Sequence, residues 1–405
     1  MKYLSKQDFT ILLGNVVDHF DRYLYVFLAP VLAPLFFPNS DPIIALIIAY
    51  SILATSIITR PIGVYVFGMI AKIHGPTKAL SNSLIGVGFA TLSIGLLPDY
   101  NLIGAFAPVL LVIFRMFRDV FAEGENAVAK LYILQDKSTK EAFNGSYLYQ
   151  ASTVLGIAFA SLASTLVHYS DYKDSWRICY FLGGGAAIVG YVLRKSAIKI
   201  DAKKSDSLLT IYSYNGLKTI WKYRADCLRI AVVNSFSHLT YVLPFVTMNS
   251  LIPLISNIDI KDMMLINSCA LFFDILAIPI AGRMLSNIAP KKIMMASSFV
   301  LALTIVPLWY FLDGASFLYV TCVRLWILVL GVVFLCPLNL WCAEQIKGDE
   351  QYMIVGMGAT IGAITVGKLT PAICLALYYY SGSHVPIAFY VMSISILVGL
   401  VMKGK

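Results

Sequence analysis

Charged residues are scarce in this chain of 405 residues: only 13% are Asp, Glu, Lys or Arg, against about 25% in typical soluble proteins. Hydrophobic residues make up 59%, and the mean hydropathy is +0.78. So apolar a chain cannot bury its surface in water-soluble cores, which excludes a disordered protein, a secreted disulfide scaffold and an ordinary soluble enzyme. We therefore expect an all-α membrane protein that crosses the bilayer many times.

Motifs for metal, redox and nucleotide chemistry are also missing. The seven cysteines form no CxxC pair, so we expect no redox centre and no metal site. Gly362–Lys368 matches the G-x-x-x-x-G-K pattern, but Leu369 follows it and no strand precedes it. We therefore expect no nucleotide or other cofactor, and either an ion gradient or the substrate's own gradient as the energy source. No nucleophile–base pair appears, so we expect no enzyme activity.

Long apolar segments fill the rest of the chain. Crossing a bilayer as a helix takes about 20 residues, and strands are excluded because the segments are long and lack period-two alternation. Turn residues separate the segments, as in Pro98-Asp99 and Asp313-Gly314. Twelve transmembrane helices are predicted, at about 10–37, 43–71, 79–97, 102–131, 143–167, 177–194, 229–255, 263–287, 292–312, 316–343, 352–380 and 385–402.

The distribution of Lys and Arg predicts the orientation in the membrane. If both termini are cytoplasmic, 22 of the 31 basic residues lie on the cytoplasmic side and only Lys173, Arg177 and Lys261 lie outside. The remaining six lie within the predicted helices. This is the asymmetry that the positive-inside rule requires. The net charge of +9 then needs no nucleic-acid partner.

The two halves of the chain resemble each other. The second and eighth segments end in similar stretches, Gly68–Lys78 and Gly282–Lys292, each a helix end, a short turn and a basic residue. The fourth and tenth segments each contain an arginine, Arg115 and Arg324. This pattern predicts a major facilitator fold with two six-helix pseudo-repeats. We expect bundles at 1–194 and 223–405 and a cytoplasmic linker at 195–222.

The first segment resembles a known family. Residues 14–25 read G-N-V-V-D-H-F-D-R-Y-L-Y and F-F-P follows at 36–38, similar to the G-N-x-x-E-W-Y-D-F-x-x-Y and F-F-P of the metabolite:proton symporter family. Further matches are Arg60-Pro61-Ile-Gly63, Arg115 to Glu125, and Trp176-Arg177. The resemblance covers the amino-terminal half well and the carboxy-terminal half poorly. The loop after the second segment lacks the family's D-R-x-G-R.

Polar residues on one face of the first helix suggest a transport site. Asn15, Asp18, Arg22 and Tyr25 share this face, with Asp21 beside it. An ionisable residue within the bilayer usually faces a cavity or a partner. We therefore expect Asn15, Arg22 and Tyr25 to bind substrate and Asp18 or Asp21 to take the proton. The alternative is a local Asp18–Arg22 ion pair.

Other charged residues within the predicted helices extend this hypothesis. Arg115 and Arg118 of the fourth helix and Lys368 of the eleventh are the further candidates for substrate binding. Asp274 of the eighth helix is either a proton carrier or a salt-bridge partner. The candidates for gating are Arg60, Gly68, Gly75, Glu125 and Arg324.

The resemblance implies a proton-coupled transporter of the inner (plasma) membrane that works by alternating access. The central arginines and lysine favour a substrate that bears a carboxylate, because arginine offers paired donors to this group. We therefore expect import of a small organic acid. The alternatives are a zwitterionic osmolyte or amino acid, such as proline or betaine, and a carboxylate siderophore or drug, with export as an option. The expected partners are this substrate and the lipid bilayer, and we expect a monomer.

Overall fold

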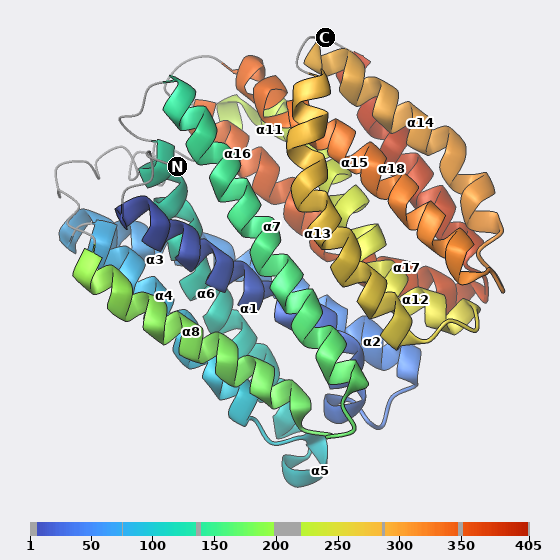
Figure 1. The fold of residues 1–405 in the computed structure, drawn as a ribbon, viewed down its shortest axis with the longest axis horizontal. Helices are drawn as coiled ribbons and strands as arrows, with labels where there is room; N and C mark the ends of the chain where they lie inside the picture. The colour runs from blue at the N-terminus through green and yellow to red at the C-terminus, as the bar shows by residue number, and fades with distance from the viewer. Residues whose placement is uncertain are drawn as a thin grey trace. The chain divides into compact units, whose positions relative to one another are not determined.

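The computed structural model describes residues 6–74, 76–134, 139–197, 220–285, 288–346 and 351–403, and these residues form helices joined by short turns (Figure 1). Each of the twelve predicted segments falls on one helix or on consecutive helices. One short helix that was not predicted, α5 (Tyr100–Ile103), precedes α6. The predicted linker at 195–222 lies mostly outside the described residues.

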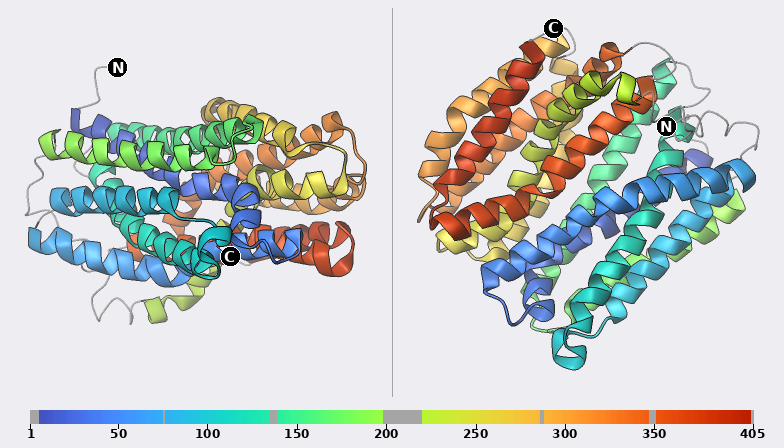
Figure 2. Two further views of the ribbon diagram at one scale, coloured as in Figure 1. Left: turned by 90° about the horizontal axis from the view of Figure 1, so that it is seen from below. Right: turned by 180° about the vertical axis from the view of Figure 1, so that it is seen from behind.

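The chain divides into two compact units. The first contains residues 1–39 and 55–213, and the second contains residues 40–54 and 214–405. In the first unit, α1 packs against α7 and α8, and α4 packs against α6 and α8, so that the long helices run side by side (Figure 2). Its long helices are α1 (Lys6–Phe36), α3 (Ser56–His74), α4 (Pro76–Leu96), α6 (Phe106–Leu134), α7 (Thr139–Tyr169) and α8 (Ser175–Ala197).

The second unit has the same kind of construction, with α14 against α15 and α18, and α11 against α15 and α16. Its helices are α2 (Pro42–Ser51), α11 (Arg224–Val242), α12 (Met248–Ile255), α13 (Ile260–Leu285), α14 (Pro290–Tyr310), α15 (Phe317–Gln345), α16 (Gln351–Gly362), α17 (Thr370–Ser381) and α18 (Val385–Lys403).

The second predicted span is interrupted. Asp41 caps α2 by accepting a hydrogen bond from the backbone N–H of Ile43 at 2.9 Å, and a 3₁₀ turn at Ile52–Thr55 separates α2 from α3. Helix α2 packs on α17 of the second unit. The buried Tyr50 hydroxyl and Ser250 Oγ share a hydrogen bond of 2.7 Å. The first part of this span, which contains α2, therefore groups with the second unit.

Two helices of the second unit contain a wide π turn. One turn, Leu243–Thr247, joins α11 to α12 and includes Pro244. The other, Ala363–Lys368, joins α16 to α17 just before Pro371. Proline has no N–H to donate and its ring crowds the preceding turn, so the regular hydrogen-bond pattern is disturbed at these points. Lys368 is the last residue of the second turn.

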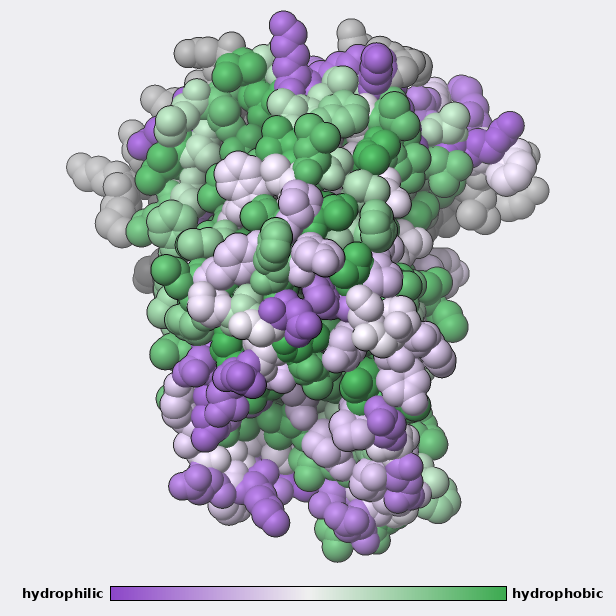
Figure 3. All heavy atoms as spheres, turned by 90° about the vertical axis from the view of Figure 1, so that its right-hand side faces the viewer, coloured by the Kyte–Doolittle hydropathy of each residue, from purple (hydrophilic) through white to green (hydrophobic). Residues whose placement is uncertain are grey.

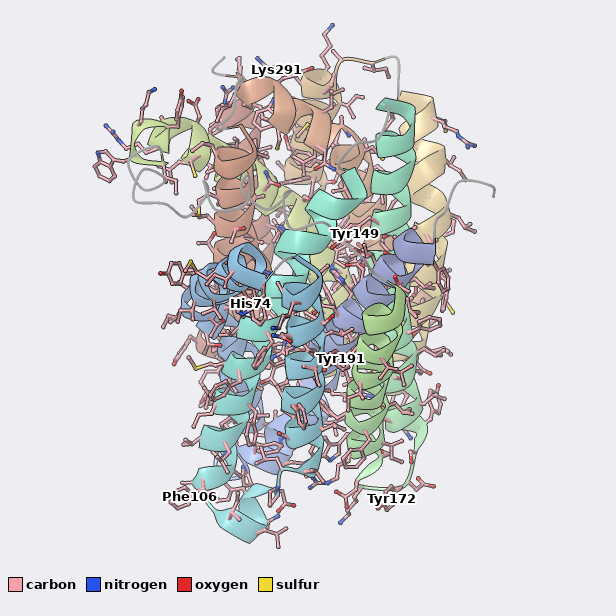
Figure 4. The ribbon with its side chains drawn as sticks, turned by 90° about the vertical axis from the view of Figure 1, so that its left-hand side faces the viewer. His74, Phe106, Tyr149, Tyr172, Tyr191 and Lys291 are labelled. Carbon is pink, nitrogen blue, oxygen red and sulfur yellow. The ribbon has the colours of Figure 1, made fainter. Side chains whose placement is uncertain are left out.

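The exposed surface fits a bilayer. Within the described residues, nine helices or joined helices are long and apolar enough to cross it. Helices α1, α6 and α8 are also long, and they contain charged residues. On the face in Figure 3, hydrophobic side chains cover much of the surface, and hydrophilic ones lie at its two ends and in smaller patches between them. Phe106 and Tyr172 lie at the same end of the first unit, away from His74 (Figure 4). The chain is a multi-pass membrane protein.

Candidate functional site

The polar face of α1 meets α6 inside the first unit. Asp18, Asp21, Arg115 and Arg118 each have only 1% of their surface exposed. The two arginines lie one turn apart on α6, and the two acids lie one turn apart on α1, so that the groups face each other in register. The structure therefore brings these four predicted site residues together at one place.

Arg118 is the centre of this network. Its Nη2 donates to Asp18 Oδ1 at 3.1 Å, and its Nε donates to Asp21. Its Nη1 reaches Asp119 Oδ1 at 3.4 Å. Thr91 of α4 donates to the other oxygen of Asp21 at 2.6 Å. Arg118 was predicted to bind substrate, and the structure places it among three carboxylates.

Asp18 also pairs with Arg22, which lies on the same polar face of α1. Arg22 Nη2 donates to Asp18 Oδ2 at 3.0 Å, four residues along the same helix. This is the local pair that the sequence left open as an alternative. Asp18 therefore bridges Arg22 and Arg118, whereas Asp21 is held by Arg118 and Thr91. The carboxylates of this cluster are each matched by a guanidinium or a hydroxyl.

Arg115 differs from its neighbours because no carboxylate of the described residues pairs with it. Its Nη2 donates to the backbone oxygen of Arg22 at 3.3 Å, and its guanidinium lies 4.6 Å from the centre of the Tyr25 ring. Its Nε and Nη1 are buried and have no hydrogen-bond partner in the described part of the chain. A buried arginine with two unused donors is costly without an anion.

Sequence reasoning missed Tyr180, which belongs to the same place. It lies on α8, is fully buried, and interacts electrostatically with Arg115, Asp21 and Tyr25. Its hydroxyl has no hydrogen-bond partner among the described residues. A single tyrosine within an apolar helix carries no sequence signal, so only the packing of α8 against α1 and α4 reveals it.

Asn15 of α1 contacts α7. Its Nδ2 donates to Ser152 Oγ at 2.8 Å, to Thr153 Oγ1 at 2.9 Å and to the Tyr149 carbonyl at 3.2 Å, all on α7. A Cβ at Gly156 would collide with the Val16 carbonyl, so the two backbones approach closely here. Asn15 therefore joins α1 to α7. Its part in substrate binding stays a prediction.

Two further residues that the sequence singled out, Arg324 and Asp274, are buried in the second unit. Arg324 of α15 is completely buried, and its Nη2 donates to Asn249 Oδ1 at 2.7 Å while its Nη1 donates to the Met263 carbonyl at 3.3 Å. It thereby links α15 to α12 and α13. Asp274, near the middle of α13, is 2% exposed. Lys368 is partly exposed at the end of its π turn.

The gating candidates are described only in part. Arg60 is partly exposed on α3, and the nearby Gly63 allows a close approach to the Val120 carbonyl of α6. Gly68 lies on α3 and Glu125 lies on α6. The surroundings of these two residues are outside the described part of the structure. Gly75 lies outside the described residues. Within the described residues, no cluster of three or more His, Cys, Asp or Glu could hold a metal ion.

Known proteins share this fold. The chain superposes on a D-xylose-proton symporter with a TM-score of 0.76, at 12% identity and over 99% of this chain and 98% of the other. The chain therefore has the fold of this symporter, the major facilitator fold that the sequence predicted.

No family model matches the chain. Sequence relatives indicate which kind of transporter it resembles. It is 25% identical to the alpha-ketoglutarate permease of Escherichia coli strain K12 over 97% of this chain and 92% of the permease. It is 34% identical to the proline/betaine transporter of the same strain over 187 residues, 45% of this chain and only 37% of that transporter. These relatives are transporters and permeases, not enzymes. The chain is therefore similar to transporters of small metabolites, in keeping with the resemblance of its first helix to the metabolite:proton symporter family.

Proposed function

We propose that the protein is a proton-coupled secondary transporter that imports a small carboxylate-bearing metabolite by alternating access. It acts as a monomer in the inner membrane, with both termini in the cytoplasm. The observation that carries the proposal is Arg115, whose Nε and Nη1 have no partner in the described residues. The coupling proton binds one of the three buried acids that the sequence singles out, Asp18, Asp21 or Asp274.

The geometry around Arg115 supports an anionic group as the occupant. The guanidinium is always charged, and its planar donors match a carboxylate. Arg22 and Arg118 already have carboxylate partners, whereas Arg115 has none among the described residues. Adding a substrate carboxylate there would supply the missing negative charge. Tyr180, whose hydroxyl has no hydrogen-bond partner among the described residues, interacts electrostatically with Arg115 and would supply a further donor.

A zwitterion such as proline or betaine is the second candidate. It also carries a carboxylate that Arg115 would bind, and the 34% identity to a proline/betaine transporter over 187 residues favours it. A zwitterion differs from an organic acid in its cationic end, which needs an acid or an aromatic face. The cluster around Arg115 has an aromatic face in Tyr25, but the arginine already covers it.

Uptake into proteoliposomes tests this proposal. The purified protein is reconstituted, an inside-alkaline pH gradient is imposed, and radiolabelled α-ketoglutarate, citrate, proline and glycine betaine are offered in parallel. We expect accumulation of a carboxylate without a cationic end, and its loss when a protonophore collapses the gradient. Accumulation of betaine or proline alone would select the second candidate. Failure of all such compounds in a folded, reconstituted protein would refute proton-coupled import of this class.

A further inference from the structure

We infer that the coupling proton binds to Asp274 in the second unit, and that Asp18 and Asp21 of the first unit do not carry it. The inference rests on the proposed function, because it assigns one step of that transport cycle. It comes from a contrast between buried acids. Two of them are held by arginines, and one has no partner in the described part of the chain.

Asp274 is isolated along its own helix. It is the fifteenth residue of α13 (Ile260–Leu285) and only 2% exposed. Its Oδ1 has no hydrogen-bond partner, and no Lys or Arg of the described residues lies within ion-pair distance. The other charges of α13 are Lys261 and Asp262 at its start and Arg283 near its end. At about 1.5 Å per residue, the nearest of them is about 13 Å away along the helix.

Among the described residues, the helices α12 and α15 that pack against α13 place no compensating charge close to Asp274. Helix α12 contains no titratable residue. Helix α15 contains Arg324, which binds the Met263 carbonyl, and this carbonyl is eleven residues from Asp274, or about 16 Å along α13. Glu344 lies at the far end of α15. The group of α15 that interacts electrostatically with Asp274 is the Cys336 thiol, which donates to the Ile278 carbonyl at 3.7 Å.

A carboxyl in such a place favours its neutral form. Taking an ionised carboxylate out of water without a partner is expensive, and binding a proton removes the charge. A metal cation is a poorer occupant, because it needs several oxygen ligands and the described residues around Asp274 supply a single carboxylate and a thiol. The proton taken up on one side of the membrane would leave when a change of conformation brings water to Asp274.

Asp18 and Asp21 are poor carriers by the same reasoning. Protonating either one removes a counter-charge from Arg118, which is buried and cannot lose its own charge. Protonating Asp18 would also remove the counter-charge of Arg22. The network therefore ties both of these acids into ion pairs, whereas Asp274 can exchange a proton without disrupting any ion pair of the described residues.

The transport test compares Asp274→Asn with wild type in proteoliposomes, with radiolabelled α-ketoglutarate or whichever compound of the uptake panel wild type accumulates. Two assays are run: accumulation driven by an imposed pH gradient, and counterflow against unlabelled compound without a gradient. We expect Asp274→Asn to keep counterflow and to lose accumulation above equilibrium. Asp262→Asn, an exposed acid at the start of the same helix, should keep both.

The possible results separate the inference from the proposed function. Full gradient-driven accumulation by Asp274→Asn would overturn the inference. Loss of counterflow together with accumulation, in a variant that unfolds at the wild-type temperature, would also overturn it, because Asp274 would then hold substrate. If wild type itself accumulates nothing, the proposed function fails instead.

A second measurement needs no substrate. Infrared difference spectra of the reconstituted protein, titrated from acidic to alkaline pH, report the C=O stretch of protonated carboxyl groups. We expect a protonated-carboxyl band at neutral pH in wild type and in Asp262→Asn, and its absence in Asp274→Asn. An unchanged band in Asp274→Asn would show that the buried proton is elsewhere, whatever the transport assays give.

Discussion

Arg118 Nη2 lies 3.1 Å from Asp18 Oδ1 and 2.8 Å from the Asp18 backbone oxygen, across a sequence separation of 100 residues. The same guanidinium reaches Asp21 through Nε. One residue of α6 therefore fixes the polar face of α1. Its neighbour Arg115, one turn earlier, is left to interact with something other than a carboxylate of the described residues.

Replacing Arg118 should destabilise the protein. Arg118→Gln leaves Asp18 and Asp21 buried without their common partner, and removing one member of a buried ion pair costs about 3–5 kcal/mol. We expect a clear fall in the midpoint of thermal unfolding in detergent. Arg224→Gln is the control, because Arg224 is exposed at the start of α11 and should change the midpoint little. Equal midpoints for Arg118→Gln and wild type would contradict the network described above.

Replacing Arg115 should affect transport and leave stability almost unchanged. Arg115→Gln removes no ion pair among the described residues, but it takes away the charged donors for a substrate carboxylate. A hydrogen bond to a charged group contributes about 1.5–3 kcal/mol, so the apparent affinity for substrate should fall about tenfold to a hundredfold. Concentration-dependent uptake and thermal unfolding, measured on the same preparation, check the two halves of this prediction. Normal uptake by Arg115→Gln would contradict the substrate site.

Removing the hydroxyl group should have different effects on stability and transport at Tyr180 and at Tyr50. Tyr180→Phe removes a hydroxyl without a partner in the described residues, so stability should stay the same and KM should rise about three- to tenfold. Tyr50→Phe removes the hydrogen bond to Ser250 and should lower stability by about 1 kcal/mol. The pair is compared by thermal unfolding and by uptake kinetics. An unchanged KM for Tyr180→Phe would remove this residue from the site.

The close approach of α1 and α7 predicts a sensitive glycine. Gly156→Ala would place a Cβ against the Val16 carbonyl and His19 Cβ, and overpacking of this kind costs about 1–3 kcal/mol. Gly185→Ala on α8 is the matched control, since nothing lies within 4 Å of the added Cβ. Alanine is also the better helix former, so this variant should be as stable as wild type or slightly more so. Thermal unfolding of the two variants provides the comparison.

Sequence patterns could predict the helices and the local contacts along them. The Asp18–Arg22 pair follows from a spacing of four residues, and the shared polar face of α1 follows from helical periodicity. Contacts between distant segments could not be predicted in the same way. The links from Arg118 to Asp18 and Asp21, and from Asn15 to α7, depend on how helices about 100 or more residues apart pack.

The irregular turns within the predicted spans could not be predicted from the sequence either. Pro244 and Pro371 suggest a disturbed helix, but they do not say that each is accompanied by a π turn. The 3₁₀ turn at Ile52–Thr55 has no proline or glycine to mark it. The apolar segment around Asp274 predicts that this residue lies within the membrane. The sequence does not predict whether Asp274 has a partner, because that depends on the packing of α12 and α15 against α13.

Simultaneous measurement of substrate and proton movement tests proton-coupled import through Arg115 most directly. Wild-type and Arg115→Gln proteins are reconstituted without a pH gradient, an organic acid that wild type transports is added outside, and a dye trapped inside reports pH. We predict that wild type acidifies the interior as the acid enters, and that Arg115→Gln shows neither flux. Entry of the acid without proton movement, entry with protons moving outwards, or unimpaired flux in Arg115→Gln would contradict the proposed function.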